Sequence, residues 1–320
     1  MNKVRVGIVG GAGYTAGELL RILVFHPFVE IVFIHSKSNA GKFVYEVHDD
    51  LLGDTDLVFS SEYHTDIDVV FLCVSHGEAK NIVDVFKHTK IIDLSHDHRL
   101  KSPSHQFVYG LPELQKSAIK EAQYIANPGC FATAIQLALL PLAEKQLLKD
   151  DIQAFCTTGS TGAGQSLSET SHFSWRQNNL SVYKAFTHQH LAEIEQSVQQ
   201  LQNTFEHKIH IVPQRGAFTR GIMACLTMDL ELDFEEIQNI YTQKYQNEPF
   251  VWVSEKNIHL KQVVNTNKCL LYIEKHENNL MIISIIDNLL KGASGQAVQN
   301  MNLMFGLDET TGLKLKSTAF

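Results

Sequence analysis

The sequence lacks several features that mark whole classes of protein. Its five cysteines are odd in number, widely spaced and without a CxxC pair, which argues against a disulfide framework and against a zinc site. Positive charge is also scarce, because 27 lysines and arginines against 35 acidic residues leave a formal charge of -8. That sign is wrong for a protein that follows a phosphate backbone. We therefore expect neither a metal nor a nucleic-acid partner.

Uninterrupted apolar runs are absent as well. The longest stretch without a charge, 122–143, contains the interrupting residues Asn127, Pro128, Gly129, Gln136 and Pro141. It is typical of a buried loop and helix, and not of a membrane span. The chain starts directly with a strand-like segment and shows no cleavage site of a signal peptide. We expect a cytoplasmic protein with no membrane partner.

The apolar pattern of the chain indicates two domains. It has 320 residues, of which 44% are hydrophobic, enough for two buried cores. Strands and helices alternate up to about residue 95, as in βαβ units with a parallel sheet. From about Asp150 longer alternating strands predict an α+β domain with a mainly antiparallel sheet. The helices expected are 15–25, 77–87, 131–148, 191–205 and 296–305, and the strands 4–9, 31–34, 68–74, 90–94, 124–126, 209–212, 222–232, 270–274 and 281–286.

A glycine-rich turn lies where the first strand meets the first helix. Gly10 and Gly13 allow a tight turn and close approach to a pyrophosphate, and the helix expected from about Thr15, directly after Tyr14, offers free N–H groups to its charge. These four residues are the candidate phosphate-binding group. The alternative is a plain strand–helix turn.

The end of the second strand distinguishes NADP from NAD. NAD enzymes place an acidic residue here to accept the ribose 2′-hydroxyl. This chain instead has Ser36, Lys37 and Ser38, a cation between two hydroxyls that suits a 2′-phosphate. We predict NADP as the cofactor, against the alternative of a solvated loop lysine.

Cys130 is the candidate nucleophile. It follows Pro128-Gly129 at the start of an apolar helix, where free N–H groups and the helix dipole favour a thiolate. The other four cysteines lie within apolar strand-like segments, where a small buried hydrophobe is the simpler interpretation.

A cysteine nucleophile needs a proton-transfer partner, and histidine titrates in the right range. His188 and His190 open a helix beyond the domain junction. Two histidines at this spacing do not share a helix face, and without a third ligand they do not predict a metal site.

Together these motifs resemble the N-acetyl-γ-glutamyl-phosphate reductase family and, more distantly, aspartate-semialdehyde dehydrogenase. The similarity runs from Val6 to about Leu313, and position 16–17 departs from the family with Ala-Gly. It is carried by the segments 10–20, 26–27, 93–100, 109–114, 127–133, 188–196, 220–222, 266–269 and 287–307.

The resemblance implies an α/β fold with a Rossmann-type parallel-sheet dinucleotide-binding domain. This domain would span 1–150 and be completed by the C-terminal helix within 290–320, while 151–289 would form the α+β catalytic and oligomerisation domain. The resemblance also implies NADPH at the junction and a homodimer or homotetramer. It assigns the nucleophile to Cys130 and the acid/base to His190, with His188 less favoured, and places Ser160, Gly162 and Asn288 near the nicotinamide.

The substrate must carry anions, which arginines bind bidentately. Arg99 and Arg220 are our candidates, each against a structural ion pair, and Asn127 is a third candidate substrate ligand. The expected reaction is the NADPH-dependent reductive dephosphorylation of N-acetyl-γ-glutamyl phosphate through a cysteine thioester, in arginine biosynthesis. Two alternatives remain open: the same chemistry on another N-acyl-glutamyl or aminoadipyl phosphate, and a nucleotide-sensing regulator without catalysis.

Overall fold

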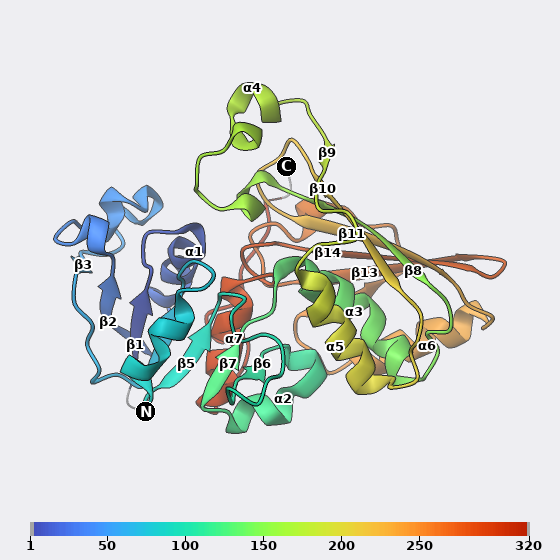
Figure 1. The fold of residues 1–320 in the computed structure, drawn as a ribbon, viewed down its shortest axis with the longest axis horizontal. Helices are drawn as coiled ribbons and strands as arrows, with labels where there is room; N and C mark the ends of the chain where they lie inside the picture. Colours follow the sequence, from blue (N-terminus) through green and yellow to red (C-terminus); the bar gives the residue numbers. More distant parts are fainter. Residues whose placement is uncertain (1–2, 319–320) are drawn as a thin grey trace. The chain divides into compact units, whose positions relative to one another are not determined.

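The computed structural model describes residues 3–318 and contains two units, each built on its own seven-stranded sheet (Figure 1). The first unit comprises the chain up to Pro128 together with Ala293–Lys314. The second comprises Gly129–Gly292 and a short stretch from Leu315. We predicted a boundary near residue 150. The structure divides the chain at 128–129 because the apolar helix that follows packs on the second sheet.

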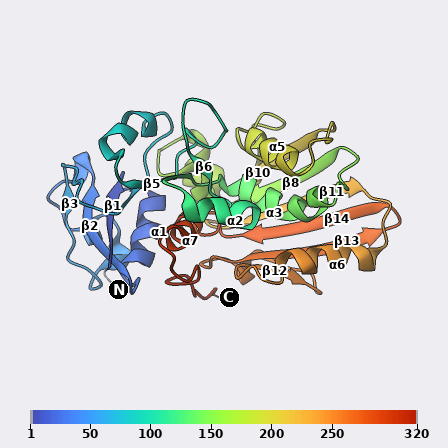
Figure 2. The same cartoon turned by 90° about the horizontal axis from the view of Figure 1, so that it is seen from below.

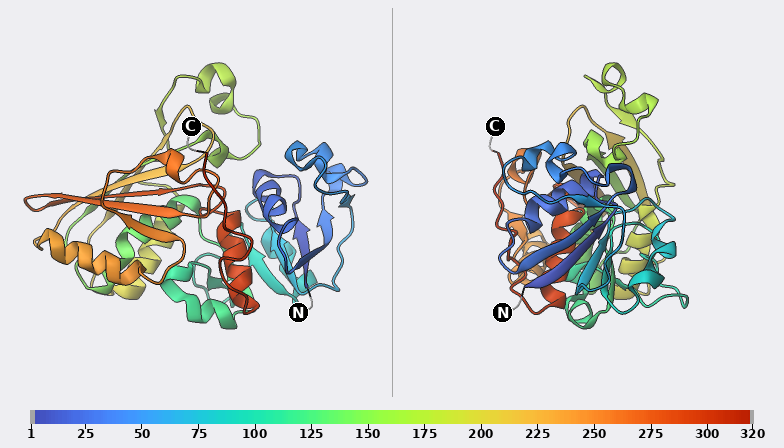
Figure 3. Two further views of the ribbon diagram at one scale, coloured as in Figure 1. Left: turned by 180° about the vertical axis from the view of Figure 1, so that it is seen from behind. Right: turned by 90° about the vertical axis from the view of Figure 1, so that its left-hand side faces the viewer.

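The first sheet is parallel throughout, as the βαβ pattern predicts. Its strand order is β3-β2-β1-β4-β5-β7-β6, and the right-hand view of Figure 3 shows its strands fanning with the usual twist. The strands are β1 (Val4–Val9), β2 (Val29–His35), β3 (Phe59–Ser60), β4 (Val69–Leu72), β5 (Lys90–Asp93), β6 (Val108–Tyr109) and β7 (Tyr124–Ala126).

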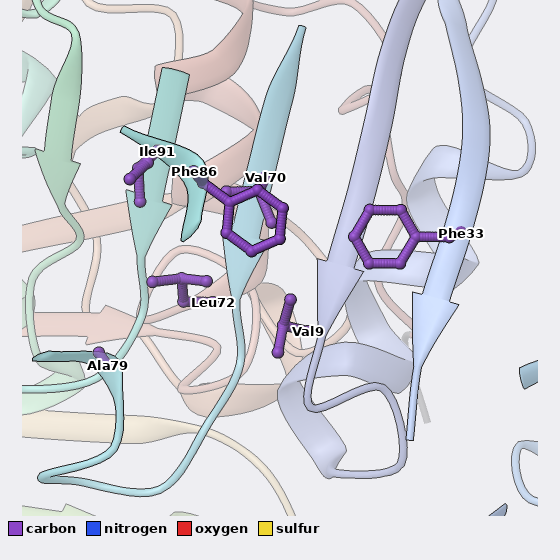
Figure 4. Close-up of a cluster of buried hydrophobic side chains, with 7 residues drawn as sticks. All are labelled: Val9, Phe33, Val70, Leu72, Ala79, Phe86 and Ile91. Carbon is purple, nitrogen blue, oxygen red and sulfur yellow. The ribbon is translucent and has the colours of Figure 1, made fainter. Parts of the chain in front are cut away.

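The central strands carry apolar side chains on both faces because a parallel sheet is covered on both sides. Figure 4 shows one of the resulting clusters. Within it the rings of Phe33 and Phe86 stack with their centroids 6.3 Å apart. The cluster consists of Val9, Phe33, Val70, Leu72, Ala79, Phe86 and Ile91.

Three α-helices belong to this unit: α1 (Tyr14–Leu23), α2 (Pro112–Glu121) and α7 (Ser294–Met304). The C-terminal helix α7 is buried along its whole length and packs on α1 and α2. The hydroxyl of Ser294 donates to the carbonyl of Thr15 at 2.7 Å, which ties α7 to the start of α1. The helix predicted at 77–87 is wrong as an α-helix, because the segment forms two 3-10 helices, Ala79–Asn81 and Val83–Phe86.

The second sheet is mixed, with order β12-β13-β14-β11-β8-β10-β9. Four of its six strand pairs are antiparallel, in line with the mainly antiparallel sheet predicted. β13 and β14 form a hairpin in which eight residues of each strand are paired (Figure 3, left). The strands are β8 (Ile152–Thr158), β9 (Ser181–Val182), β10 (Ile209–Arg215), β11 (Ile222–Asp229), β12 (Val251–Ser254), β13 (Cys269–His276) and β14 (Asn279–Ile286).

Helices α3 (Cys130–Glu144), α5 (His190–Leu201) and α6 (Phe234–Tyr245) pack together on this sheet, with α6 alongside β12 (Figure 2). The buried helix α3 tolerates Pro141 for a specific reason. A proline cannot donate to the carbonyl four residues earlier. The hydroxyl of Tyr245 donates to that carbonyl, on Leu137, at 2.5 Å. The uncharged stretch of the sequence is therefore a buried helix, and no helix within residues 3–318 is long and apolar enough to cross a membrane.

Sequence patterns missed the seven-residue strand β8 and also the short or weakly apolar elements α2, α4 (Phe173–Arg176), α6, β3, β6, β9 and β12. Strands of two residues carry no periodicity, and α6 buries only Ile237, Tyr241 and Tyr245.

Candidate active site

Cys130 is the first residue of α3, as predicted. Gly129 is the N-cap, in an extended conformation, and the first-turn N–H of Thr133 donates to its carbonyl at 2.8 Å. The helix has no side-chain cap and no acidic residue in its first turn. The positive end of the helix dipole therefore faces the thiol of a partly exposed cysteine.

His190 begins α5, which lies beside α3 (Figure 1). Its imidazole lies so close to Gly129 that a Cβ at that position would be 2.3 Å from Nε2. Glu193 stands one turn later, with Oε1 4.0 Å from the same Nε2. Its Oε2 accepts the N–H of Gly129 at 2.9 Å. One carboxylate therefore bonds the turn before Cys130 and lies beside the histidine next to it.

His188 lies next to His190, with ring centroids 4.5 Å apart. Burial, and then the charges of Lys184 and Arg215, lower its pKa from 6.5 to about 4. Its Nδ1 accepts the N–H of His190 at 3.2 Å, so the neutral ring carries its proton on Nε2. At neutral pH His188 is therefore predominantly a neutral hydrogen-bond donor.

The remaining cysteines fit the structural interpretation. Burial raises the pKa of Cys73 to about 12 and raises the pKa of Cys156 and Cys225 as well. Cys269 is buried inside β13. These thiols stay protonated or inaccessible at neutral pH.

The loop after β14 also approaches Cys130. A Cβ on Gly292 would lie 2.8 Å from the Cβ of Cys130. Asp287, which is fully buried, shapes this loop by accepting the N–H groups of Leu289 and Leu290 at 2.8 and 3.1 Å. The same carboxylate pairs with Arg220 through two bonds of 3.1 Å.

Asn288 is engaged at both ends of its amide. Its oxygen accepts the N–H of Gly221 at 2.7 Å, and its nitrogen donates to the hydroxyl of Thr161 at 3.0 Å. Asn288 thereby joins the loop after β14 to the glycine-rich loop, whose 3-10 helix Ser160–Ala163 contains Ser160 and Gly162. The structure brings these three predicted residues together, and it shows Arg220 with its fork already occupied by Asp287.

The predicted phosphate-binding turn lies in the first unit. Gly10 has a φ of +83°, and a Cβ on it would lie 2.4 Å from the carbonyl oxygen of Cys73, so only glycine fits. Gly13 is the N-cap of α1, which has no side-chain cap, so its N–H groups at Tyr14 and Thr15 suit a pyrophosphate. Gly17, the second residue of the Ala-Gly pair that departs from the family pattern, makes room for His48, whose Nε2 bonds the carbonyl of Gly11 at 2.7 Å.

Ser36, Lys37 and Ser38 follow β2 directly, as predicted. Asn39 extends this group by donating to the hydroxyls of Ser36 and Ser38 at 3.3 and 3.2 Å, and it accepts from Lys42 at 3.3 Å. The Ser36–Lys42 segment carries two exposed lysines and no acidic residue, a composition that fits the 2′-phosphate of NADP.

Arg99 and Asn127 also lie in the first unit. Arg99 is 6% exposed, and its Nη2 donates to the carbonyl of Leu94 at 3.0 Å. Asn127 is 1% exposed and donates to the carbonyl of Ala293 at 3.0 Å, while its oxygen accepts from Asn300 at 3.2 Å. Both side chains thus have structural contacts in addition to the substrate roles we predicted.

Sequence reasoning missed Glu193 and Gly292. A signal existed for Glu193, since it stands three residues after His190 and therefore on the same side of the helix. Gly292 gave none, because its contact with Cys130 joins residues far apart in the chain. Among residues 3–318 one group could hold a metal, Asp150, Asp151 and His207, and it includes neither His188 nor His190.

Comparison with known proteins decides the family. A protein of Phocaeicola vulgatus named N-acetyl-gamma-glutamyl-phosphate reductase is 57% identical over 99% of this chain and 100% of its own length. The chain belongs to the N-acetyl-gamma-glutamyl-phosphate reductase family. Reductases of the same name from Bacteroides thetaiotaomicron and Flavobacterium johnsoniae are each 56% identical over 99% of this chain and 100% of their own length.

Family models agree with this membership. Residues 5–122 match the semialdehyde dehydrogenase NAD binding domain, and residues 130–288 match the semialdehyde dehydrogenase dimerisation domain. The fold is shared with aspartate semialdehyde dehydrogenase II of Vibrio cholerae, with a TM-score of 0.76 at 14% identity over 96% of this chain and 99% of that one. The Candida albicans enzyme, solved with NADP, gives 0.70 at 14% identity over 95% and 99%.

Proposed function

We propose that this protein reduces N-acetyl-γ-glutamyl phosphate to N-acetylglutamate semialdehyde with NADPH, a step of arginine biosynthesis. The observation that carries the proposal is Cys130 at the open N-terminus of α3, with His190 against the preceding glycine, in a chain 57% identical to a reductase of that name. A thiolate, a proton carrier and an uncapped helix terminus are the groups that acyl transfer needs.

The proposed reaction starts with attack of the Cys130 thiolate on the acyl carbon. The C–O bond to phosphate breaks, phosphate leaves, and a thioester on Cys130 remains. A nicotinamide cofactor supplies the hydride that reduces this thioester. His190 exchanges a proton with the reacting oxygen while the aldehyde and the thiolate separate. Glu193 holds His190 and the Gly129 turn for these steps.

NADP is the proposed cofactor. Its pyrophosphate would lie on Gly10, Gly13 and the start of α1, and its 2′-phosphate on Ser36, Lys37 and Ser38. The positive φ of Gly10 and the absence of an acidic residue in the Ser36–Lys42 segment support this assignment. Ser160, Gly162 and Asn288 are proposed for the nicotinamide end, and Arg99, Asn127 and Arg220 stay candidate substrate ligands.

The test is turnover by the purified protein. In the reverse direction, the protein should form NADPH from N-acetylglutamate semialdehyde, phosphate and NADP, and the absorbance of NADPH measures the rate. Cys130→Ala should abolish this signal. Absence of turnover in either direction would contradict the proposal. Parallel assays with other N-acyl-glutamyl and aminoadipyl substrates compare the acyl chain, since kcat/KM measures the discrimination between them.

We also propose that the second unit forms the interface of a homodimer. Side chains alternate along its strands, so Ala154 and Cys156 are buried on the helix side while Phe155, between them, is 47% exposed. On the face that carries Phe155, opposite to the helices, part of the surface is covered by a cluster built on Ile258, Val263, Ile283 and Ile285. Exposed apolar surface of this kind marks association sites, and the match of 130–288 to a dimerisation domain supports the proposal.

Light scattering coupled to size-exclusion chromatography tests this interface. Phe155→Glu should shift the mass towards the monomer, whereas Phe25→Glu, which changes a 63% exposed phenylalanine of the first unit, should not. A wild-type monomer, or a dimer unaffected by Phe155→Glu, would count against it. A tetramer sensitive to Phe155→Glu would place this interface within the larger assembly.

A further inference from the structure

Two arginines of the second unit contact each other and lack a carboxylate partner within the described residues. Arg176 and Arg215 form no ion pair with any acidic residue of the described chain, 3–318, whereas Arg220 is paired with Asp287. Arg176 is 7% exposed and donates only to neutral oxygens, namely the carbonyls of Thr170 and Arg215 and the hydroxyl of Ser181. Its hydrogen bonds are satisfied, but its charge is not neutralised.

Arg215 is the more available of the two. It is the last residue of β10, and its guanidinium lies over the ring of Tyr183, with its central carbon 4.5 Å from the centroid. Its Nε is buried without a hydrogen-bond partner within the described residues. A buried N–H of a charged group costs free energy when nothing accepts it. The side chain of Arg215 also bonds the Tyr183 hydroxyl, but its Nε still lacks an acceptor, which favours an incoming oxyanion at this guanidinium.

Short ring contacts connect Arg215 to the histidine pair. The ring of Tyr183 meets the ring of His188 edge-on at 6.0 Å, and His188 is 4.5 Å from His190. The charge of Arg215 helps to lower the pKa of His188, after burial and Lys184. The charge of Cys130 also acts on Tyr183. Burial and then this charge raise the pKa of the Tyr183 hydroxyl to about 12, whereas the charge of Arg215 lowers it. These residues share one electrostatic environment within the second unit.

Glu193, an acidic residue of the same unit, already has other partners. Glu193 accepts from Gly129 and contacts His190, and no contact joins it to Arg215 within the described residues. Two adjacent cations without a counter-ion are unfavourable unless an anion binds. The proposed substrate brings two, the acyl phosphate and the α-carboxylate, and a planar guanidinium binds either bidentately.

We propose that Arg215, whose backbone carbonyl accepts from Arg176 and whose guanidinium lies over Tyr183, binds an oxyanion of the substrate beside the His188–His190 pair. This role rests on the proposed function, and it is additional to the roles assigned to Arg99 and Arg220. Arg215 would bind a pair of oxygens, which either the α-carboxylate or the phosphoryl group offers. The reverse reaction distinguishes these two groups, because the carboxylate belongs to the semialdehyde and the phosphoryl oxygens belong to inorganic phosphate.

Initial rates of the reverse reaction, with each substrate varied in turn, test the proposal. Arg215→Met keeps the packing on Tyr183 but removes the charged fork, and Arg215→Lys keeps the charge alone. Loss of charge-assisted bonds should raise one KM about 10- to 100-fold in the methionine variant, and less in the lysine variant. A higher KM for the semialdehyde identifies the α-carboxylate, and a higher KM for phosphate identifies the phosphoryl group. Arg5→Met removes an arginine that pairs with Asp66 in the first unit and controls for net charge.

Both KM values within about twofold of wild type, in a variant with an unchanged Tm, would overturn the proposal. A lower kcat with both KM values unchanged would do the same. Alkylation of Cys130 by iodoacetamide gives a readout without turnover: N-acetylglutamate or inorganic phosphate should protect the wild type and fail to protect Arg215→Met. A wild type that is protected but does not turn over would contradict the proposed function and leave the anion site standing.

Discussion

The imidazole of His190 lies against the Cα of Gly129, where a Cβ would come within 2.3 Å of Nε2. Real Cβ atoms do not approach other atoms so closely. Gly129 is therefore required by the histidine on the neighbouring helix and not by its own backbone, whose φ of -70° any residue can adopt.

Gly129→Ala should displace the His190 ring and lower kcat by at least about 100-fold, the lower range for loss of a positioned acid/base. Steady-state kinetics measure this effect. In a His190→Ala background the same substitution should cost little further activity, because the ring it displaces is gone. Additive losses would mean that Gly129→Ala acts through the Cys130 turn instead.

Cys130→Ala should lower kcat at least about a thousandfold while NADPH affinity stays near that of the wild type. Alkylation mapped by mass spectrometry should find Cys130 modified first, since burial raises the pKa of Cys73 and Cys225. Cys225→Ser serves as the matched control. Variant activity within tenfold of wild type would reject Cys130 as the nucleophile.

His190→Asn should lower kcat by about 100- to 10,000-fold and remove the alkaline fall of kcat that loss of the histidine proton causes. His188→Asn should act mainly on KM, because a pKa of about 4 leaves His188 neutral at neutral pH. The pH profiles of both variants distinguish these roles. The opposite pattern would transfer the acid role to His188.

The protein should prefer NADPH to NADH by about 10- to 100-fold in kcat/KM, because one or two charge-assisted bonds reach the 2′-phosphate. Lys37→Ala should reduce this preference without a matching loss with NADH. Lys87→Ala, at an exposed lysine of the same unit, provides the control. Equal kcat/KM with the two cofactors in the wild type would refute the assignment of Lys37.

Stability should fall as the pH drops below 6.5. The folded pKa of His188 lies near 4, so the unfolded chain binds this proton first and the contribution of His188, at most about 3 kcal/mol, is lost between pH 6.5 and 4. The lowered pKa values of His26, His35, His76 and His105 act in the same direction. Thermal unfolding across this range should show a shallower slope for His188→Asn than for His88→Asn. Equal slopes would contradict the role of His188.

The local chemistry of the chain was readable from its sequence. Runs of apolar residues predict the parallel strands β1, β4 and β5. The glycine at position 10 predicts the tight turn, because glycine readily adopts the positive φ that the structure shows there. Cys130 at the start of α3 follows from Pro-Gly before an apolar helix. Each of these features depends on residues within a few positions of one another, where backbone geometry and side-chain period act directly.

The tertiary structure decided the contacts between segments that are distant in the sequence. Only the fold pairs Arg220 with Asp287, 67 residues away, and leaves Arg215 with an aromatic ring in place of a carboxylate. Only the fold brings Glu193 to Gly129, 64 residues away. Sequence could name the residue types that acyl transfer requires, but which arginine is neutralised and which stays available depends on packing between helices and loops, and no local pattern encodes that.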